Sequence, residues 1–236
     1  MSYSNYGLAL LSEVESLCGK QIFLSHDSKL EGLYYVNLDS ALISHREINP
    51  TADGCVHELS HLKLIKLGCP EVLLRRERES NRWVLAVSHF LNDLFEHHIF
   101  FPELVANGFS PYTNEESGLA SQLEKIVNEK IHLKPPSNSP SLEYLDSEFA
   151  FFAIVYARAF LECESPQLRE KCITIFSTPY LSKSVQLGEE LIQVVRLFAV
   201  HDFKKVKMGM EKSLELLSLA RYLKVSTAPQ PVAPAD

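Results

Sequence analysis

Three things are scarce in this sequence: positive charge, paired cysteines and long apolar runs. Lys and Arg total 23 against 30 Asp and Glu, which gives a formal net charge of −7. A protein that binds nucleic acid through its charge needs a basic surface, so this balance argues against such a protein. The longest apolar run, around residues 149–157, falls far short of the roughly twenty residues that span a bilayer. We therefore expect neither nucleic acid nor a membrane among its partners.

The cysteines do not follow the pattern of a disulfide-rich or zinc-ribbon protein. Their number is odd, and no two of them are spaced as CxxC. The N-terminal sequence also lacks the basic and apolar segments of an export signal. These absences predict reduced thiols in a cytoplasmic protein. The cysteines are Cys18, Cys55, Cys69, Cys163 and Cys172.

The spacing of apolar residues predicts a mostly helical chain with a small sheet near its start. Short runs rich in aromatic and β-branched residues within 21–48 predict two or three antiparallel strands. A charged stretch at 75–82 is expected to be a solvent-exposed connection. Helical spacing predicts helices over 4–18, 52–67, 83–100, 114–131, 141–163, 166–176, 184–200 and 204–222.

These elements define the expected fold class and domains. The fold class is α+β, mostly α, with a small antiparallel sheet and a C-terminal helical region. We expect a first domain over 1–110 and a helical region over 111–224, packed on or beside it. The Pro/Ala-rich residues 225–236 have little to bury, and we expect a disordered tail there.

Five of the nine histidines fall at positions 57, 61, 89, 97 and 98. Residues 57–61 read His-Glu-Leu-Ser-His, the HExxH pattern, inside the predicted helix 52–67. Residues four apart on a helix differ by about 40° in direction, so His57 and His61 can both reach one ion. Glu58 lies about 100° further round, where its carboxylate can hold a water molecule and accept its proton. The pattern predicts a zinc site with Glu58 as general base.

A different interpretation of the histidine pair is structural. Histidines that face a protein core are usually satisfied by hydrogen bonds and bind nothing. Here Gly54 and Gly68 share the histidine side of the helix, and small residues leave room for an ion. This arrangement favours zinc over a hydrogen-bonded core pair.

Catalytic zinc needs a third protein ligand and one open position. Four side chains in the predicted helix 83–100 fall within one arc of about 100°, namely His89, Asp93, Glu96 and His97. We rank His97 first as the third ligand, Asp93 second and Glu96 third. Whichever of His97 and Asp93 does not bind would accept the N–H of a ligating histidine. Taken alone, this arc is also typical of the exposed face of an amphipathic helix.

Three residues in or beside this arc have lesser roles in the hypothesis. His89 and Asn92 are expected at the edge of the site, supporting the ligands. His98 points to the apolar side of the helix and is expected in the core or an interface.

The short sheet, the HExxH helix and the histidine-bearing helix resemble the zincin metallopeptidases, more narrowly their ImmA/IrrE-like intracellular members. The resemblance covers residues 20–110 and implies a zincin-like core, with His57 and His61 as zinc ligands and Glu58 as general base. The third ligand of this family is commonly a downstream glutamate, so the choice here stays open. The resemblance also implies that a peptide binds as an added strand along residues 41–48. The longer signatures HxxGxxH and NExxSD are absent.

These observations predict a zinc-dependent metallopeptidase, a hydrolase acting on a protein or peptide. His45, Tyr156 and Arg158 are candidates to stabilise the oxyanion of the reaction. The alternative is a non-catalytic zinc-binding or protein-interaction module whose helical half binds a partner. A helical adaptor without metal is a third possibility.

Overall fold

The computed structural model describes residues 4–26, 34–37, 42–45, 53–75, 82–128 and 142–227. These residues form two compact units. Unit 1 takes its described residues from Met1–Cys69, Phe100–Pro111 and Thr227–Asp236, and unit 2 from Pro70–Ile99 and Tyr112–Ser226. The units divide the chain differently from the predicted domains 1–110, 111–224 and 225–236, because residues 70–99 group with the later helices.

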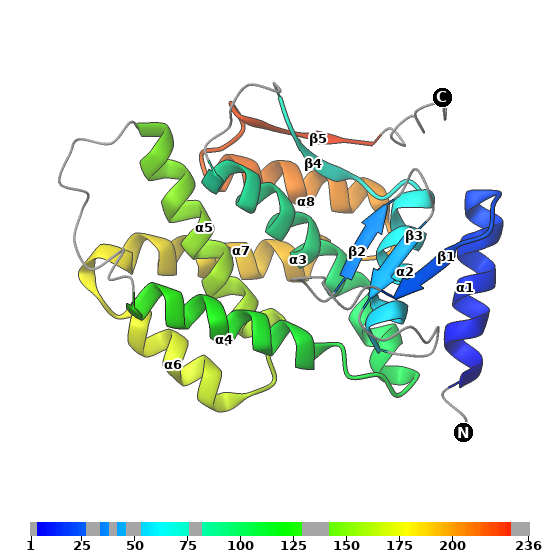
Figure 1. Ribbon diagram of the computed structural model, residues 1–236. Helices are drawn as coiled ribbons and strands as arrows, with labels where there is room; N and C mark the ends of the chain where they lie inside the picture. The colour runs from blue at the N-terminus through cyan, green and yellow to red at the C-terminus, as the bar shows by residue number, and fades with distance from the viewer. Residues whose placement is uncertain are drawn as a thin grey trace. The chain divides into compact units, whose positions relative to one another are not determined.

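Unit 1 combines helices with a three-stranded sheet (Figure 1). Helix α1 packs against α2, and α2 contacts strands β2 and β3. The last residues of α3 also belong to this unit. The elements are α1 (Ser4–Cys18), β1 (Phe23–His26), β2 (Tyr34–Asn37), β3 (Leu42–His45), α2 (Asp53–Lys66) and α3 (Arg82–Ala106).

The sheet has the order β1-β3-β2, which corrects two expectations. Strands β2 and β3 pair antiparallel as predicted, but β1 and β3 pair parallel. Because β3 lies in the middle, both of its edges are hydrogen-bonded over Leu42–His45. A peptide therefore cannot be added along β3, and the expectation that this part of residues 41–48 binds the substrate as an added strand is wrong; residues 41 and 46–48 lie outside the described residues. The open edges of the described sheet belong to β1 and β2.

Unit 2 consists of helices and one two-stranded sheet. Helix α5 packs against α7, and α7 packs against α8. Strands β4 and β5 run antiparallel side by side (Figure 1). The further elements are β4 (Glu71–Leu74), α4 (Tyr112–Asn128), α5 (Leu142–Leu161), α6 (Pro166–Phe176), the 3-10 turn Pro179–Leu181, α7 (Ser182–Phe198), α8 (Phe203–Leu216) and β5 (Leu223–Ser226).

The fold class is confirmed as α+β and mostly α, with two strands that the sequence analysis missed. Strand β5 includes residues 225 and 226 of the predicted tail, and residues 228–236 lie outside the described part. Arg75, at the start of the predicted charged connection, donates its Nε–H to the carbonyls of Ala220 and Leu223, 2.7 and 2.9 Å away. This arginine therefore helps to hold β4 beside β5.

Two further findings concern the described residues of both units. None of the five cysteines, all in described residues, forms a disulfide bond. No helix among the described residues combines the length and apolarity that crossing a membrane requires.

Gly188 allows α7 to approach α5 closely, and this contact predicts a stability change. A Cβ at Gly188 would lie 2.7 Å from Tyr156 Cδ1 and 2.9 Å from the backbone oxygen of Ala153. We expect Gly188→Ala to destabilise unit 2 by about 1–3 kcal/mol, because backbone cannot give way as a side chain can. Urea unfolding followed by the fluorescence of Trp83, the single tryptophan, measures this change.

Gly118→Ala is the matched control, because a Cβ at Gly118 on helix α4 meets nothing within 4 Å. Alanine is the better helix former, so this variant should be about as stable as the wild type or slightly more so. Equal stability of the two variants would show that α5 and α7 can separate at no cost.

Candidate metal centre

The first two predicted ligands converge on helix α2. The Nε2 atoms of His57 and His61 lie 3.1 Å apart, within hydrogen-bond distance. Zinc–nitrogen bonds of about 2.0–2.1 Å in a tetrahedron place two ligand nitrogens roughly 3.3 Å apart. The two side chains therefore fit a single zinc ion with little rearrangement. His57 is buried, with 7% of its surface exposed, and His61 is half-buried.

Aromatic side chains of helix α3 pack against the histidine pair within unit 1. The ring of Phe100 meets both imidazoles nearly edge to face, with centroids 5.5 Å from His57 and 4.9 Å from His61. Phe101 lies 5.9 Å from His57. These contacts restrict the rotation of both imidazole rings and keep water away from part of the site.

Glu58, the predicted general base, is half-buried on the same helix. Burial of Cys55, together with the charge of Glu58, raises the pKa of the Cys55 thiol to about 11. That thiol is therefore protonated at neutral pH. Among the described residues, Cys55 belongs to no group of side chains whose ligand atoms lie close enough together to hold a metal ion.

Contacts at both ends hold helix α2 in unit 1. At its start, the Asp53 carboxylate accepts the backbone N–H of Ser110 at 3.1 Å. At its end, Gly68 takes a positive φ of 88°, which lets the Cys69 N–H bond to the carbonyl of Leu64. Lys63 forms an ion pair with Glu13 of α1 at 3.0 Å.

His97, the favoured third ligand, lies on the part of α3 that belongs to unit 2. Its side chain is only 2% exposed, and its Nδ1 lies 2.8 Å from Glu162 Oε1. A carboxylate accepts hydrogen bonds, so His97 donates from Nδ1, and in the neutral ring the lone pair is then on Nε2. Nε2 is thus the nitrogen suited to metal binding.

Arg158, predicted as an oxyanion stabiliser, is bound to two carboxylates. Its Nε–H donates to Glu162 Oε2 at 2.5 Å, and its guanidinium also bonds to the carboxylate of Glu115. The guanidinium lies over the ring of Phe90, 4.9 Å from the centroid. Burial alone would lower the pKa of Arg158, but Glu162 and Glu115 outweigh it and raise the pKa. Arg158 is therefore a permanent cation in unit 2.

The same region contains a second set of ligand atoms. His97, Glu115 and Glu162 each offer one atom within 4.8 Å of the others, a buried group that could hold a metal ion. Since Arg158 bonds to both carboxylates, a cation already neutralises part of their charge. These groups support metal binding in general but do not identify zinc.

Other predicted residues of α3 have contacts within unit 2. The carboxamide of Asn92 accepts the Val72 N–H at 2.7 Å and donates to the Val72 carbonyl at 3.3 Å. Asn92 therefore ties α3 to strand β4. Glu96 is buried. The pKa of Glu71 is raised, mainly because Glu71 is itself buried and further because of the negative charge of Glu96. The charge of Asp93 acts on Arg158.

The two outer histidines of α3 differ in exposure. His89 is exposed. His98 is half-buried, and its pKa is lowered by burial and by the charge of Arg196, while Glu162 opposes the shift. His98 is thus neutral at physiological pH, as suits a histidine on the apolar side of the helix.

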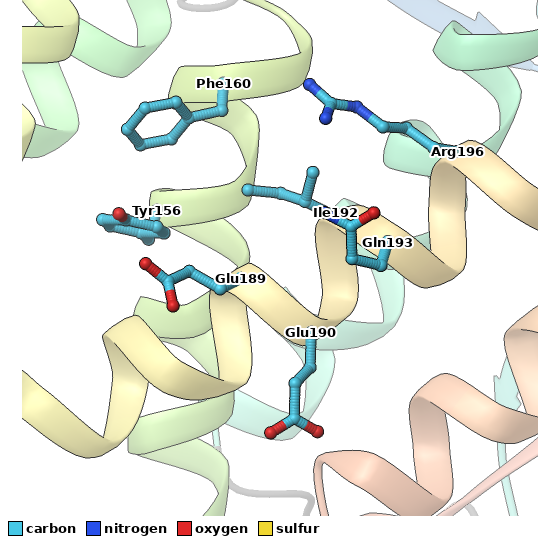
Figure 2. A pocket seen from close by; sticks show the side chains of 7 residues that line it. All are labelled: Tyr156, Phe160, Glu189, Glu190, Ile192, Gln193 and Arg196. Carbon is cyan, nitrogen blue, oxygen red and sulfur yellow. The ribbon is translucent and has the colours of Figure 1, made fainter.

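The remaining oxyanion candidates lie on other elements. His45 ends β3, in register with Tyr34 of β2 and His26 of β1. Tyr156 of α5 lies beside Phe160 and faces Glu189 of α7 (Figure 2). Both aromatic residues line a cavity of about 440 Å³ in unit 2, and burial followed by the Glu189 charge raises the pKa of Tyr156.

Sequence reasoning missed Glu115 and Glu162. The spacing of Arg158 and Glu162, four residues apart, is typical of a helical ion pair. Nothing in the local sequence links Glu162 with His97, 65 residues earlier. His57 and His61 belong to unit 1, whereas Asp93, Glu96 and His97 belong to unit 2, so the choice of third ligand stays a prediction.

Comparison of the chain with models of known protein families, with curated proteins and with solved structures found no match.

Proposed function

We propose that the protein is a zinc-dependent metallopeptidase with a zincin-like site that hydrolyses a peptide bond in a protein or peptide. The observation that carries this proposal is the convergence of His57 and His61, whose Nε2 atoms are 3.1 Å apart. Glu58 follows His57 on the same helix, in the position of the base in the HExxH pattern. We further propose the cytoplasm as its setting, as the odd number of cysteines and the lack of CxxC spacing predict.

His97 is our choice of third ligand because its Nδ1 bond to Glu162 is the contact that zinc-binding histidines usually make with a carboxylate. Asp93 and Glu96 remain the alternatives, although their charges act on Arg158 and Glu71.

Different side chains of the protein would carry out different steps of the hydrolysis. Zinc held by the histidines would supply a Lewis acid that polarises a peptide carbonyl and acidifies a water molecule. The Glu58 carboxylate would accept the proton of that water and pass it to the leaving amine. The aromatic rings of Phe100 and Phe101 would limit access of bulk water and strengthen these electrostatic interactions.

One observation favours the second candidate, a non-catalytic zinc-binding module with a helical partner-binding half. Strand β3 is paired on both sides, so the expected way of binding a peptide along it is closed. In this second function the histidines would hold zinc for stability or for contact with a partner. Binding of a peptide at the edge of β1 or β2 would instead agree with the metallopeptidase. Replacement of Glu58 by glutamine distinguishes the metallopeptidase from the non-catalytic module.

The proposed zinc site predicts how much zinc the protein retains. We expect the zinc-loaded wild type to hold about one zinc per chain after dialysis, and His61→Ala to hold less than about 0.2. Metal analysis of the purified proteins by mass spectrometry measures both. His201→Ala is the matched control, because His201 is an exposed histidine of unit 2. A wild type with less than about 0.2 zinc per chain would overturn the proposal.

A further inference from the structure

We propose that Glu162 is a positioning residue that orients His97 and strengthens its Nε2 as a metal ligand, with Arg158 holding Glu162 in place. This inference rests on the proposed function, since it takes His97 to be a zinc ligand. It adds a residue from the end of helix α5 that the HExxH pattern does not contain.

The first support is the way Glu162 uses its two oxygens. Oε1 accepts from His97 Nδ1 at 2.8 Å, and Oε2 accepts from Arg158 Nε at 2.5 Å. The three side chains are nearly inaccessible, with exposures of 2% for His97, 3% for Glu162 and 5% for Arg158. A carboxylate bonded through both oxygens cannot rotate freely, and so the plane of the imidazole is also restricted.

The second support is that the network joins three helices of unit 2. His97 lies on α3, Glu115 on α4 and Arg158 on α5, while Glu162 directly follows α5. The guanidinium of Arg158 connects the carboxylates of Glu115 and Glu162. The Glu162 N–H donates to the Arg158 carbonyl at 2.8 Å, which keeps the last helical turn closed. The position of Glu162 is thus fixed by backbone and side chain together.

The third support is chemical. A carboxylate that accepts the Nδ1 proton selects the tautomer with its lone pair on Nε2 and makes that nitrogen more basic. Interactions between charges are stronger in a buried setting than in water. Two carboxylates face one guanidinium in this network, so a positive ion bound at His97 would be attracted to it.

A metal ion held by His97, Glu115 and Glu162 themselves is the competing assignment. Their ligand atoms lie within 4.8 Å of one another. Arg158, however, bonds to both carboxylates, and a metal there would have to displace a buried guanidinium. Glu162 is therefore assigned to the support of His97 and not to the metal itself.

The test compares Glu162→Gln with Glu148→Gln. Glu148 is also a buried carboxylate of unit 2, and it accepts the hydroxyl of Tyr180 at 2.8 Å. Zinc affinity is measured by competition with a chromophoric chelator, and the ligand geometry by the visible absorption of the cobalt-loaded proteins. Circular dichroism and thermal unfolding show whether each variant is folded.

We expect Glu162→Gln to weaken zinc binding by about 10- to 100-fold and to change the cobalt spectrum, while Glu148→Gln keeps both. Equal zinc affinities of a folded Glu162→Gln and the wild type would overturn the inference, and so would equal losses in the two variants. A wild type that binds no zinc would remove the proposed function itself.

Glu162→Asp provides a second measurement that does not depend on the glutamine variant being folded. It keeps the charge but shortens the side chain by one methylene, so the bond to His97 is strained while Arg158 remains neutralised. We expect Glu162→Asp to bind zinc more weakly than the wild type and more tightly than a folded Glu162→Gln. If Glu162→Gln is unfolded, we expect Glu162→Asp to bind zinc at least about threefold more weakly than the wild type. An affinity equal to that of the wild type would contradict the positioning role.

Discussion

We expect Glu58→Gln to lose most of the proposed peptide hydrolysis and to keep its zinc. Glutamine has the size of glutamate but cannot accept a proton, so the variant keeps the surroundings of His57 and His61 and loses the base. General-base catalysis contributes about 10²- to 10⁴-fold, and we expect a fall in kcat of that size. The measurement is cleavage of a defined library of ten-residue peptides by the zinc-loaded proteins, detected by mass spectrometry.

Glu103→Gln is the control for this substitution. Glu103 is a carboxylate of the α3 segment in unit 1 that accepts the hydroxyl of Tyr6 at 3.0 Å, and we assign it no part in the reaction. It should keep the activity of the wild type. Unchanged activity in Glu58→Gln would remove Glu58 as the base. A wild type that binds zinc but cleaves no peptide would favour the non-catalytic zinc-binding module.

The helix that bears the HExxH pattern was predictable because its signals are local. The predicted range of 52–67 agrees with the observed Asp53–Lys66, and Gly68 ends the helix in a positive-φ conformation. Helix α6 was predicted with its observed bounds, since Ser165 caps it and Pro166 fills its first turn. Such residues act on the backbone within a few positions, so their effect can be recognised without knowledge of the fold.

The sheet pairings were less predictable because they depend on distant segments. Alternation and composition show where β1 and β3 lie but not which strands become neighbours. Only the short connection between β2 and β3 favours an antiparallel pair, which is the pair that was predicted correctly. Strand β4 pairs with β5 at the far end of the chain, and each has only four residues. The sequence near either strand contains no sign of the other.

The candidate site shows the same difference between local and distant information. The spacing of His57 and His61 on one helix predicted that both imidazoles could reach one ion, and their Nε2 atoms lie 3.1 Å apart. Whichever of His97 and Asp93 does not bind the metal was expected to accept the N–H of a ligating histidine, and no acceptor for His97 itself was predicted. The structure provides Glu162, because packing of α3 with the end of α5 brings this carboxylate to Nδ1. Contacts between helices of this kind require the tertiary structure.

We expect Arg158→Met to destabilise unit 2 by about 3–5 kcal/mol, the cost of removing one partner of a buried ion pair. Methionine fills much of the space of arginine but leaves the carboxylates of Glu115 and Glu162 without the guanidinium that bonds to both. The desolvation of these charges is then no longer offset. Urea unfolding followed by the fluorescence of Trp83, which is buried in unit 2 against Phe151, measures the loss.

Arg221→Met is the matched control, because Arg221 forms an ion pair with Asp146 at 2.9 Å but is 53% exposed. Exposed pairs contribute about 0–1 kcal/mol, so this variant should lose little stability. Equal losses in the two arginine variants would show that the buried network does not depend on the Arg158 charge. Adding Glu115→Gln to Arg158→Met should recover part of the loss, because one of the two carboxylates left without the guanidinium is then neutral.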